Sequence, residues 1–502
     1  MSTVSPGGTT PPKPPPSLGG LPAPPNPPGP LRRWLAELAW LPGQGLCYDV
    51  LIEASGERFT SVTPDTPSIP SDTEHLSGLT LPGFANAHSH AFHRALRAST
   101  QADGGTFWTW RERMYEVAAQ LDPDSYRRLA RAVYAEMALA GISCVGEFHY
   151  LHHQPDSRPY PDPNAMGRAL IEAAAEAGLR ITLLDACYLT GGLDPSAPAP
   201  ISASPSAYTP SAPSGLLPLV GAQVRFTDGN AERWAARVTA LGYDQYGMVT
   251  PHAKVGAAIH SIRAVPREQM HQIVTWAHGC GAPLHVHMSE QQAENDVCQA
   301  FYGVSPARLL YEQDVLGPRT TVVHATHVDA ADLELLGGCH AFACICPTTE
   351  RDLGDGLAPT MALAEAGCTL TLGSDSHAVI DILEEARGVE YAERLAHQAR
   401  GHFTAEALLQ AATANGHASL GWPDAGEIVP GAWADLVTVS MDSARTAGAD
   451  DDLAVEAAVF AATAADIHHV VIGGRDIVRD GEHLLVQDVP GELAAAIQAI
   501  LP

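Results

Sequence analysis

Polar side chains that can bind metals recur in this chain at the ends of apolar runs that lie far apart in the sequence. His88-Ser89-His90 closes a run that starts at Phe84, and His285-Val286-His287 closes another. His324 and Asp375 end two further runs of the same kind. Residues two apart point to the same face of a strand, so each His-x-His pair can direct two imidazoles at one point. Such groups at the carboxyl ends of successive strands are typical of a (β/α)8 barrel active site.

Strand-like runs alternate with helical stretches rich in Ala, Leu, Glu and Arg, which predicts parallel α/β architecture. Eight runs can be distinguished, which is the number that closes a barrel. They lie near residues 84–88, 142–147, 180–187, 254–260, 283–288, 320–325, 341–345 and 369–374. We therefore expect a (β/α)8, TIM-type metallohydrolase barrel over residues 82–421. A Pro-, Ser- and Ala-rich insertion at 194–218 should follow its third strand.

Both ends of the chain are rich in short strands and turns. Near the carboxyl end, residues 468–478 read as two strands joined by Gly473-Gly474. Together the ends predict a small β-sandwich domain built from residues 31–81 and 422–490. We expect this domain to be flanked by a C-terminal helix at 491–502 and by an N-terminal tail at 1–30. The 12 prolines of the tail favour disorder.

Charge and composition narrow the classes of partner. A net charge of −28 argues against a nucleic-acid partner, because a phosphate backbone needs a basic surface. The sequence contains neither an apolar run of roughly 20 residues nor a signal-peptide pattern, so no membrane partner is expected. The nine cysteines show no disulfide spacing, and Cys344 and Cys346 are expected to be buried thiols. These features predict a cytoplasmic protein.

Four of the strand-end residues form a candidate metal site. His88, His90, His287 and Asp375 would supply three imidazoles and one carboxylate, which suits Zn²⁺ or a similar divalent ion with one position open for water. His285 shares the strand face of His287, so strand geometry alone leaves open which of the two binds. The runs lack a strand-end lysine that could form a bridging carbamate, which favours a single ion.

Two further groups could carry proton transfer. Glu290 follows His287 by three residues and would stand beside the metal-activated water, where a carboxylate can accept and return a proton. His324 could polarise the substrate or, with Asp375, stabilise the tetrahedral intermediate. The alternatives are structural ones: a helix-terminal glutamate for Glu290 and a hydrogen-bonded core histidine for His324.

Arginines near the strand ends could bind an anionic substrate. Arg111 and Arg113 follow the first run, and Arg263 follows the fourth. A guanidinium group there can bind a carboxylate through paired hydrogen bonds. The strand-end position favours Arg263, whereas nothing comparable singles out Arg113.

Several longer motifs make the chain similar to a known family. It resembles the amidohydrolase superfamily and, within it, the formimidoylglutamate deiminases. The Glu147–His153 and Trp108–Arg111 blocks discriminate most, because the metal-binding motifs are shared by many deaminases. The resemblance spans residues 82–377 and is carried by His88–Phe92, Phe107–Arg111, Glu147–His153, His260–Arg263, His285–Gln291, His324–His327, Thr349-Glu350, Leu353–Gly356 and Gly373–His377.

The resemblance implies one zinc ion, a homodimer and a set of residue roles. It assigns the metal to His88, His90, His287 and Asp375, and the reaction to Glu290 and His324. It assigns the glutamate portion of the substrate to Arg111, Tyr150, His260 and Arg263. Position 93 is His93, where the family usually has glutamine; that residue lines the substrate side.

The implied reaction is hydrolysis of N-formimidoyl-L-glutamate, a dicarboxylate amidine, to N-formyl-L-glutamate and ammonia in histidine degradation. One alternative is an aminohydrolase of a heterocycle such as guanine, which would need aromatic and amide groups around the metal instead of arginines. Another is a metal-free scaffold protein, which would have no reason to keep Glu290. Measuring the zinc content of the protein would distinguish such a scaffold protein from the two kinds of enzyme.

Overall fold

The computed structural model describes residues 29–102, 104–196, 215–244 and 247–501. The Pro-rich tail expected at 1–30 lies outside these ranges except for its last two residues, and most of the insertion expected at 194–218 does so as well. The ends of that insertion are described: β8 (Gly192–Leu193) and β9 (Leu216–Leu217) form an antiparallel pair.

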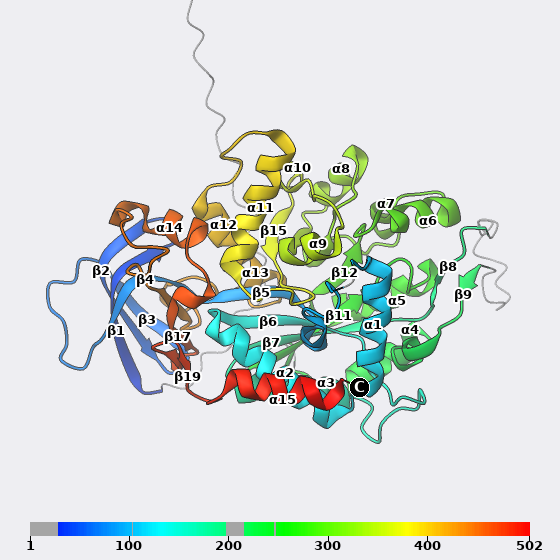
Figure 1. Ribbon diagram of the computed structural model, residues 1–502, viewed down its shortest axis with the longest axis horizontal. Helices are drawn as coiled ribbons and strands as arrows, with labels where there is room; N and C mark the ends of the chain where they lie inside the picture. The colour runs from blue at the N-terminus through cyan, green and yellow to red at the C-terminus, as the bar shows by residue number, and fades with distance from the viewer. Residues whose placement is uncertain (1–28, 103, 197–214, 245–246, 502) are drawn as a thin grey trace, which may run out of the picture.

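The centre of the molecule is a barrel of eight parallel strands, which confirms the predicted fold class (Figure 1). Each strand falls on one of the eight predicted runs, and neighbours in sequence are neighbours in the barrel. A parallel bridge between Ser89 and Asp375 joins the first strand to the end of the last. The strands are β5 (Phe84–Ser89), β6 (Ile142–His149), β7 (Arg180–Cys187), β11 (Ala253–Ile259), β12 (Leu284–Met288), β13 (Thr320–His324), β14 (Phe342–Ile345) and β15 (Thr369–Leu372).

Helices surround the barrel and return the chain from the end of one strand to the start of the next (Figure 1). They are α1 (Phe107–Gln120), α2 (Pro123–Leu139), α3 (Ala165–Ala177), α4 (Ala231–Ala240), α5 (Arg267–Cys280), α6 (Gln292–Tyr302), α7 (Pro306–Glu312), α8 (Ala330–Gly338), α9 (Pro347–Leu353), α10 (Thr360–Ala366), α11 (Ile382–His397), α12 (Ala405–Ala412) and α13 (Ala414–Ser419). Short 3₁₀ helices, η1 (Ala91–Leu96) and η2 (Gly221–Arg225), and the strand β10 (Met248–Thr250) complete this part.

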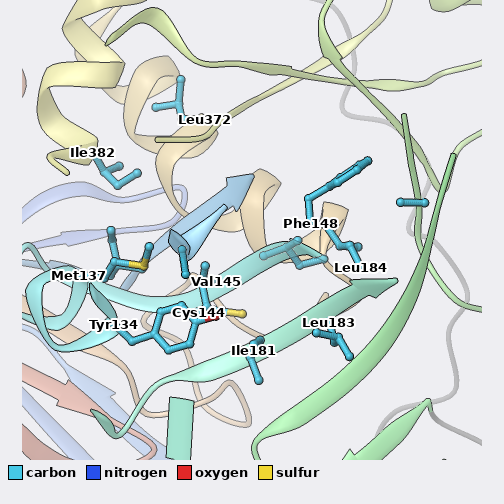
Figure 2. Packing of buried hydrophobic residues seen from close by; sticks show 14 of the residues in the cluster. Tyr134, Met137, Cys144, Val145, Phe148, Ile181, Leu183, Leu184, Leu372 and Ile382 are labelled. Carbon is cyan, nitrogen blue, oxygen red and sulfur yellow. The ribbon is translucent and has the colours of Figure 1, made fainter. Parts of the chain in front are cut away.

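Local sequence signals explain where α2 begins and which face it buries. The Asp122 side chain accepts a hydrogen bond from the Ser125 backbone at 2.8 Å, and Pro123 occupies the first turn, where no amide hydrogen is needed. Figure 2 shows Tyr134 and Met137 of α2 among the buried side chains of the barrel core, near Val145 of β6. The helix therefore belongs to the wall that holds β6 in place.

Strands from the two ends of the chain form one mixed sheet beside the barrel (Figure 1). All eight are hydrogen-bonded in a single path, in the order β19-β18-β17-β16-β4-β1-β2-β3. The predicted turn at Gly473-Gly474 joins β17 to β18, and both glycines have positive φ, 56° and 71°. The strands are β1 (Leu31–Leu41), β2 (Gly45–Ser55), β3 (Arg58–Thr63), β4 (Glu74–Pro82), β16 (Leu436–Val439), β17 (Ile467–Ile472), β18 (Arg475–Arg479) and β19 (Glu482–His483).

The sheet is tied to the barrel by buried charge and by the C-terminal helix. Arg180, at the start of β7, forms a buried two-pronged ion pair with Asp435, just before β16. The remaining elements are η3 (Asp451–Leu453), α14 (Ala454–Phe460), η4 (Ala464–Asp466) and α15 (Val489–Ile500). Helix α15 occupies the segment where the sequence predicts a terminal helix, and it packs on α2 (Figure 1).

The described ranges bear on two expectations from composition, one about membrane-spanning helices and one about the cysteines. No helix there is both long and apolar enough to cross a bilayer. The nine cysteines all lie in these ranges as free thiols, and Cys344 and Cys346 are buried inside the barrel, as their sequence pattern predicts.

Candidate functional site

The four predicted ligands converge at the carboxyl end of the barrel. His88 and His90 come from the end of β5, His287 from β12, and Asp375 from just beyond β15, and all four are buried. The His287 Nε2 atom lies 3.0 Å from His88 Nε2, and Asp375 Oδ1 lies 3.3 Å from His88 Nε2 and 3.4 Å from His90 Nε2. Ligand atoms roughly 2.0–2.1 Å from a tetrahedral zinc lie about 3.3 Å from one another, so this donor set fits a divalent ion.

Backbone carbonyls orient the imidazoles toward the centre of the cluster. The Nδ1 atom of His90 is 2.9 Å from the Phe148 carbonyl oxygen, and that of His287 is 2.8 Å from the His260 carbonyl oxygen. A proton donated from Nδ1 leaves the Nε2 lone pair free for a metal. Burial lowers the pKa of both imidazoles well below the ordinary histidine value. Neutral rings of this kind are what a metal site requires.

The structure separates His287 from His285, which strand geometry alone leaves equivalent. Both point into the barrel, but His285 lies one layer deeper, where its Nε2 is 3.1 Å from the Ser419 carbonyl oxygen. His285 is not among the four clustered ligands. The end of α13 closes this deeper layer, so His285 is hydrogen-bonded to the floor of the barrel.

The seam of the barrel runs through the candidate metal site. The backbone amide of Asp375 donates to the His88 carbonyl at 3.0 Å, and that of His90 donates to the Asp375 carbonyl at 3.2 Å. Asp375 and His324 both have positive φ, 41° and 75°, which costs non-glycine residues about 1–3 kcal/mol each. The hydrogen bonds that close the barrel hold these strand ends in the strained conformations that direct the side chains inward.

Glu290 and His324 lie beside the cluster, together with a carboxylate that the sequence reasoning did not single out. The His324 Nε2 atom is 3.9 Å from both Glu290 Oε1 and Asp375 Oδ2. Its Nδ1 is 3.3 Å from Glu350 Oε1. Burial alone would lower the pKa of His324, but Glu290, Glu350 and Asp375 raise it well above the ordinary value. Glu350 lies in α9, which begins two residues after the seventh barrel strand, so no strand-end position marked it in the sequence.

Glu290 is a buried carboxyl group whose pKa lies above the ordinary glutamate value. Burial raises its pKa, the neighbouring His324 lowers it, and Asp375 raises it further. A carboxyl group shifted in this way is better matched to proton transfer near neutral pH than an exposed glutamate.

A cavity opens directly over the cluster and brings together the residues predicted to bind substrate. Arg111 on α1 and Arg263 after β11 place two guanidinium groups in its lining. Arg113 instead pairs with Glu116 on the outer side of α1 and is not part of the lining. The lining also includes His90, His93, Phe107, Trp110, Met114, Tyr115, Tyr150, Tyr188, Phe226, His260, His287, Glu290, His324, Leu353 and Asp375.

Hydrogen bonds fix the polar groups of the cavity wall. His93 Nε2 lies 2.9 Å from the Tyr150 hydroxyl, and the Arg111 Nε donates to the Tyr115 hydroxyl at 2.6 Å. Gln223 donates to the hydroxyls of Tyr115 and Tyr188 at 3.0 and 3.1 Å. The sequence reasoning missed Tyr115, Tyr188 and Gln223. Only Tyr188 carried a usable signal, since it directly follows the third barrel strand.

A second buried cluster resembles a metal site, but its carboxylate is already engaged by other side chains. His149, His152 and Asp185 lie close enough to share an ion. However, Asp185 accepts hydrogen bonds from the Trp234 indole at 2.9 Å and from Arg237 at 2.7 and 2.8 Å. This cluster therefore pins α4 to β7 by buried ionic contacts.

Comparisons with known proteins agree with this geometry. The sequence model of the Amidohydrolase family matches residues 79–477. A formimidoylglutamate deiminase from Pseudomonas aeruginosa is 34% identical over 465 residues, covering 89% of this chain and 95% of the relative. An 8-oxoguanine deaminase from the same organism is 29% identical over 408 residues, covering 80% of this chain and 82% of the relative.

The fold is shared with solved structures over nearly the whole chain. An amidohydrolase from Brucella melitensis superposes with a TM-score of 0.80 at 29% identity, covering 94% of this chain and 100% of its own.

Proposed function

Because this chain belongs to the amidohydrolase family and is a hydrolase of carbon–nitrogen bonds, we propose that it deiminates N-formimidoyl-L-glutamate to N-formyl-L-glutamate and ammonia. The observation that carries the proposal is one cavity that combines the ligand cluster with two guanidinium groups, Arg111 and Arg263. An acidic protein needs such local cations to hold a dicarboxylate. The relative named for this activity supports the same choice.

We propose that His88, His90, His287 and Asp375 hold one divalent ion, most simply Zn²⁺, given three imidazoles and a carboxylate. Such an ion supplies Lewis acidity that makes water nucleophilic near neutral pH.

Glu290 takes the proton of the attacking water and returns it to the terminal nitrogen of the amidine. The hydroxyl group of the tetrahedral intermediate then loses the second water proton, which Glu290 carries to the same nitrogen. That nitrogen leaves as ammonia when its bond to the formimidoyl carbon breaks, and the new carbon–oxygen bond becomes the formyl carbonyl. His324, held by Glu350, and Asp375 surround the reacting carbon and stabilise the charge that develops there.

The remaining residues orient the dicarboxylate. Arg111 and Arg263 bind its carboxylates, and Tyr150, His260 and His93 complete the polar wall. His93 forms a hydrogen bond with the Tyr150 hydroxyl. It therefore fixes the position of that hydroxyl as well as facing the substrate. We also propose that the protein is a cytoplasmic homodimer that takes part in histidine degradation.

The decisive experiment measures ammonia release from three compounds by the zinc-loaded protein. N-formimidoyl-L-glutamate should be hydrolysed, and its analogue without the α-carboxylate should react with kcat/KM at least about 100-fold lower, because one charged contact is lost. Guanine tests the alternative of a heterocycle aminohydrolase, which the aromatic cavity wall favours. Release from guanine alone would replace the proposal with that alternative. Loss of activity on removing zinc, and its return on adding zinc back, would test the metal.

Arg263→Ala tests the carboxylate contact. We expect KM for N-formimidoyl-L-glutamate to rise about 100-fold, since a buried charged contact is removed, while bound zinc stays unchanged. Steady-state kinetics and elemental analysis give both values. Arg113→Ala is the matched control because Arg113 pairs with Glu116 outside the cavity. Unchanged kinetics in Arg263→Ala would remove this residue from the site.

A further inference from the structure

Helix α6 carries a carboxylate on the face that packs against the rest of the protein. The buried residues of α6 are Glu294, Cys298 and Phe301, spaced four and three apart, which is the stripe of a helix facing a core. The Glu294 side chain is only 1% exposed. A charged group in such a stripe is rare unless it has a partner.

The partner of Glu294 is Arg263. Its Oε2 lies 3.6 Å from Arg263 Nε, an ion pair that falls short of a hydrogen bond. No side chain forms a hydrogen bond with either oxygen of Glu294 or with the Nε of Arg263 within the described part of the chain, although the backbone N–H of Ser289 also acts on the carboxylate. The buried carboxylate of Glu294 and the part-buried guanidinium of Arg263 thus face one another at a distance slightly too long for a hydrogen bond.

The pair stands between two cavities. Arg263 lines the inner cavity over the metal cluster and also an outer pocket, whose lining includes Glu294, Ser261 and Gln291. The outer pocket begins beside the β8–β9 pair and has a volume of about 240 Å³. Burial raises the pKa of Glu294 to about 7, and Arg263 is the largest influence that lowers it. Glu290 raises that pKa, whereas the backbone N–H of Ser289 and the His324 side chain lower it.

A simpler reading is that Glu294 only stabilises the positive end of α6, since it lies in the first turn. An exposed glutamate would serve that purpose equally well without the cost of burial. The helix dipole also does not explain why the carboxylate faces an arginine of the cavity wall.

We propose that Glu294 is a positioning residue that holds the Nε edge of Arg263, so that the terminal nitrogens of this guanidinium meet a substrate carboxylate. The inference rests on the proposed function, because it needs a carboxylate-bearing substrate. A guanidinium has five N–H donors in a rigid fork, and anchoring one edge restricts how the other is presented. Closing the 3.6 Å gap when substrate arrives would complete the hydrogen bond.

Glu294→Met removes the charge and the acceptor while keeping an unbranched side chain in the buried stripe. We expect KM for N-formimidoyl-L-glutamate to rise about 10-fold with kcat changed less than about threefold. The melting temperature should not fall, because replacing a buried, poorly satisfied charge by an apolar group of similar size is neutral or stabilising. Glu294→Gln, which keeps an oxygen for Arg263 Nε, should recover most of the affinity.

A double-mutant cycle separates positioning from a general structural effect. If Glu294 acts through Arg263, Glu294→Met should change kcat/KM less than about twofold in the Arg263→Ala background. An equal loss in both backgrounds, or a fall in kcat without a change in KM, would overturn the inference. A wild-type protein that releases no ammonia from this substrate would defeat the proposed function itself, and the inference with it.

Discussion

Glu290→Gln should lower kcat for N-formimidoyl-L-glutamate by about a thousandfold, because a glutamine amide cannot accept a proton from water. The side chain keeps its size, and Glu290 is not one of the four clustered ligands. Zinc content should therefore remain at the wild-type level. Binding of N-formyl-L-glutamate, measured by calorimetry, should also stay within about twofold, since that contact is made by other residues.

The matched control for this substitution is Glu112→Gln, which changes an exposed carboxylate on α1 that is not part of the cavity lining. It makes the same chemical change away from His324 and the ligand cluster, and its kcat should equal that of the wild type. A Glu290→Gln protein that keeps more than about a tenth of wild-type kcat would show that another group moves the proton.

His287→Ala should abolish both metal retention and activity. Structural zinc sites bind with roughly 10–16 kcal/mol shared among four ligands, so each contributes about 3 kcal/mol, or more than a hundredfold in Kd. Elemental analysis after dialysis against a chelator measures the retained zinc, and ammonia release measures the activity. The isolated variant should hold far less than one ion per chain.

His285→Gln controls for the loss of a buried histidine on the same strand. His285 faces the barrel floor and bonds the Ser419 carbonyl, so a glutamine amide can replace that donor. Retained zinc in His285→Gln together with loss in His287→Ala is the expected pattern. The reverse pattern would identify His285, one layer deeper in the barrel, as the metal ligand instead of His287.

Most of the barrel could be predicted because apolar runs of strand length alternate with helical stretches. All eight runs coincide with the observed strands, for example β7 at Arg180–Cys187 and β11 at Ala253–Ile259. A parallel strand buried on both faces needs a nearly continuous apolar sequence, and this pattern is local.

The site was predictable where a residue lies at a strand end and not where it depends on depth or on a distant neighbour. His287 and His285 share a strand face, and only the floor provided by Ser419 distinguishes them. The contact between Glu350 and His324 joins residues 26 positions apart, so the sequence indicated no role for Glu350. Glu294 looks like an ordinary first-turn glutamate until α6 is packed against Arg263.

By itself, the sequence determined the number and order of the barrel strands and the chemical types gathered at their ends. Both follow from short-range periodicity, which fixes the face on which each side chain lies. Only the tertiary structure decided the layer of each histidine, the closing bridge from Ser89 to Asp375, and that Arg111 rather than Arg113 lines the cavity. Those features depend on the registers and distances between segments that meet only when the barrel closes, and no local pattern encodes them.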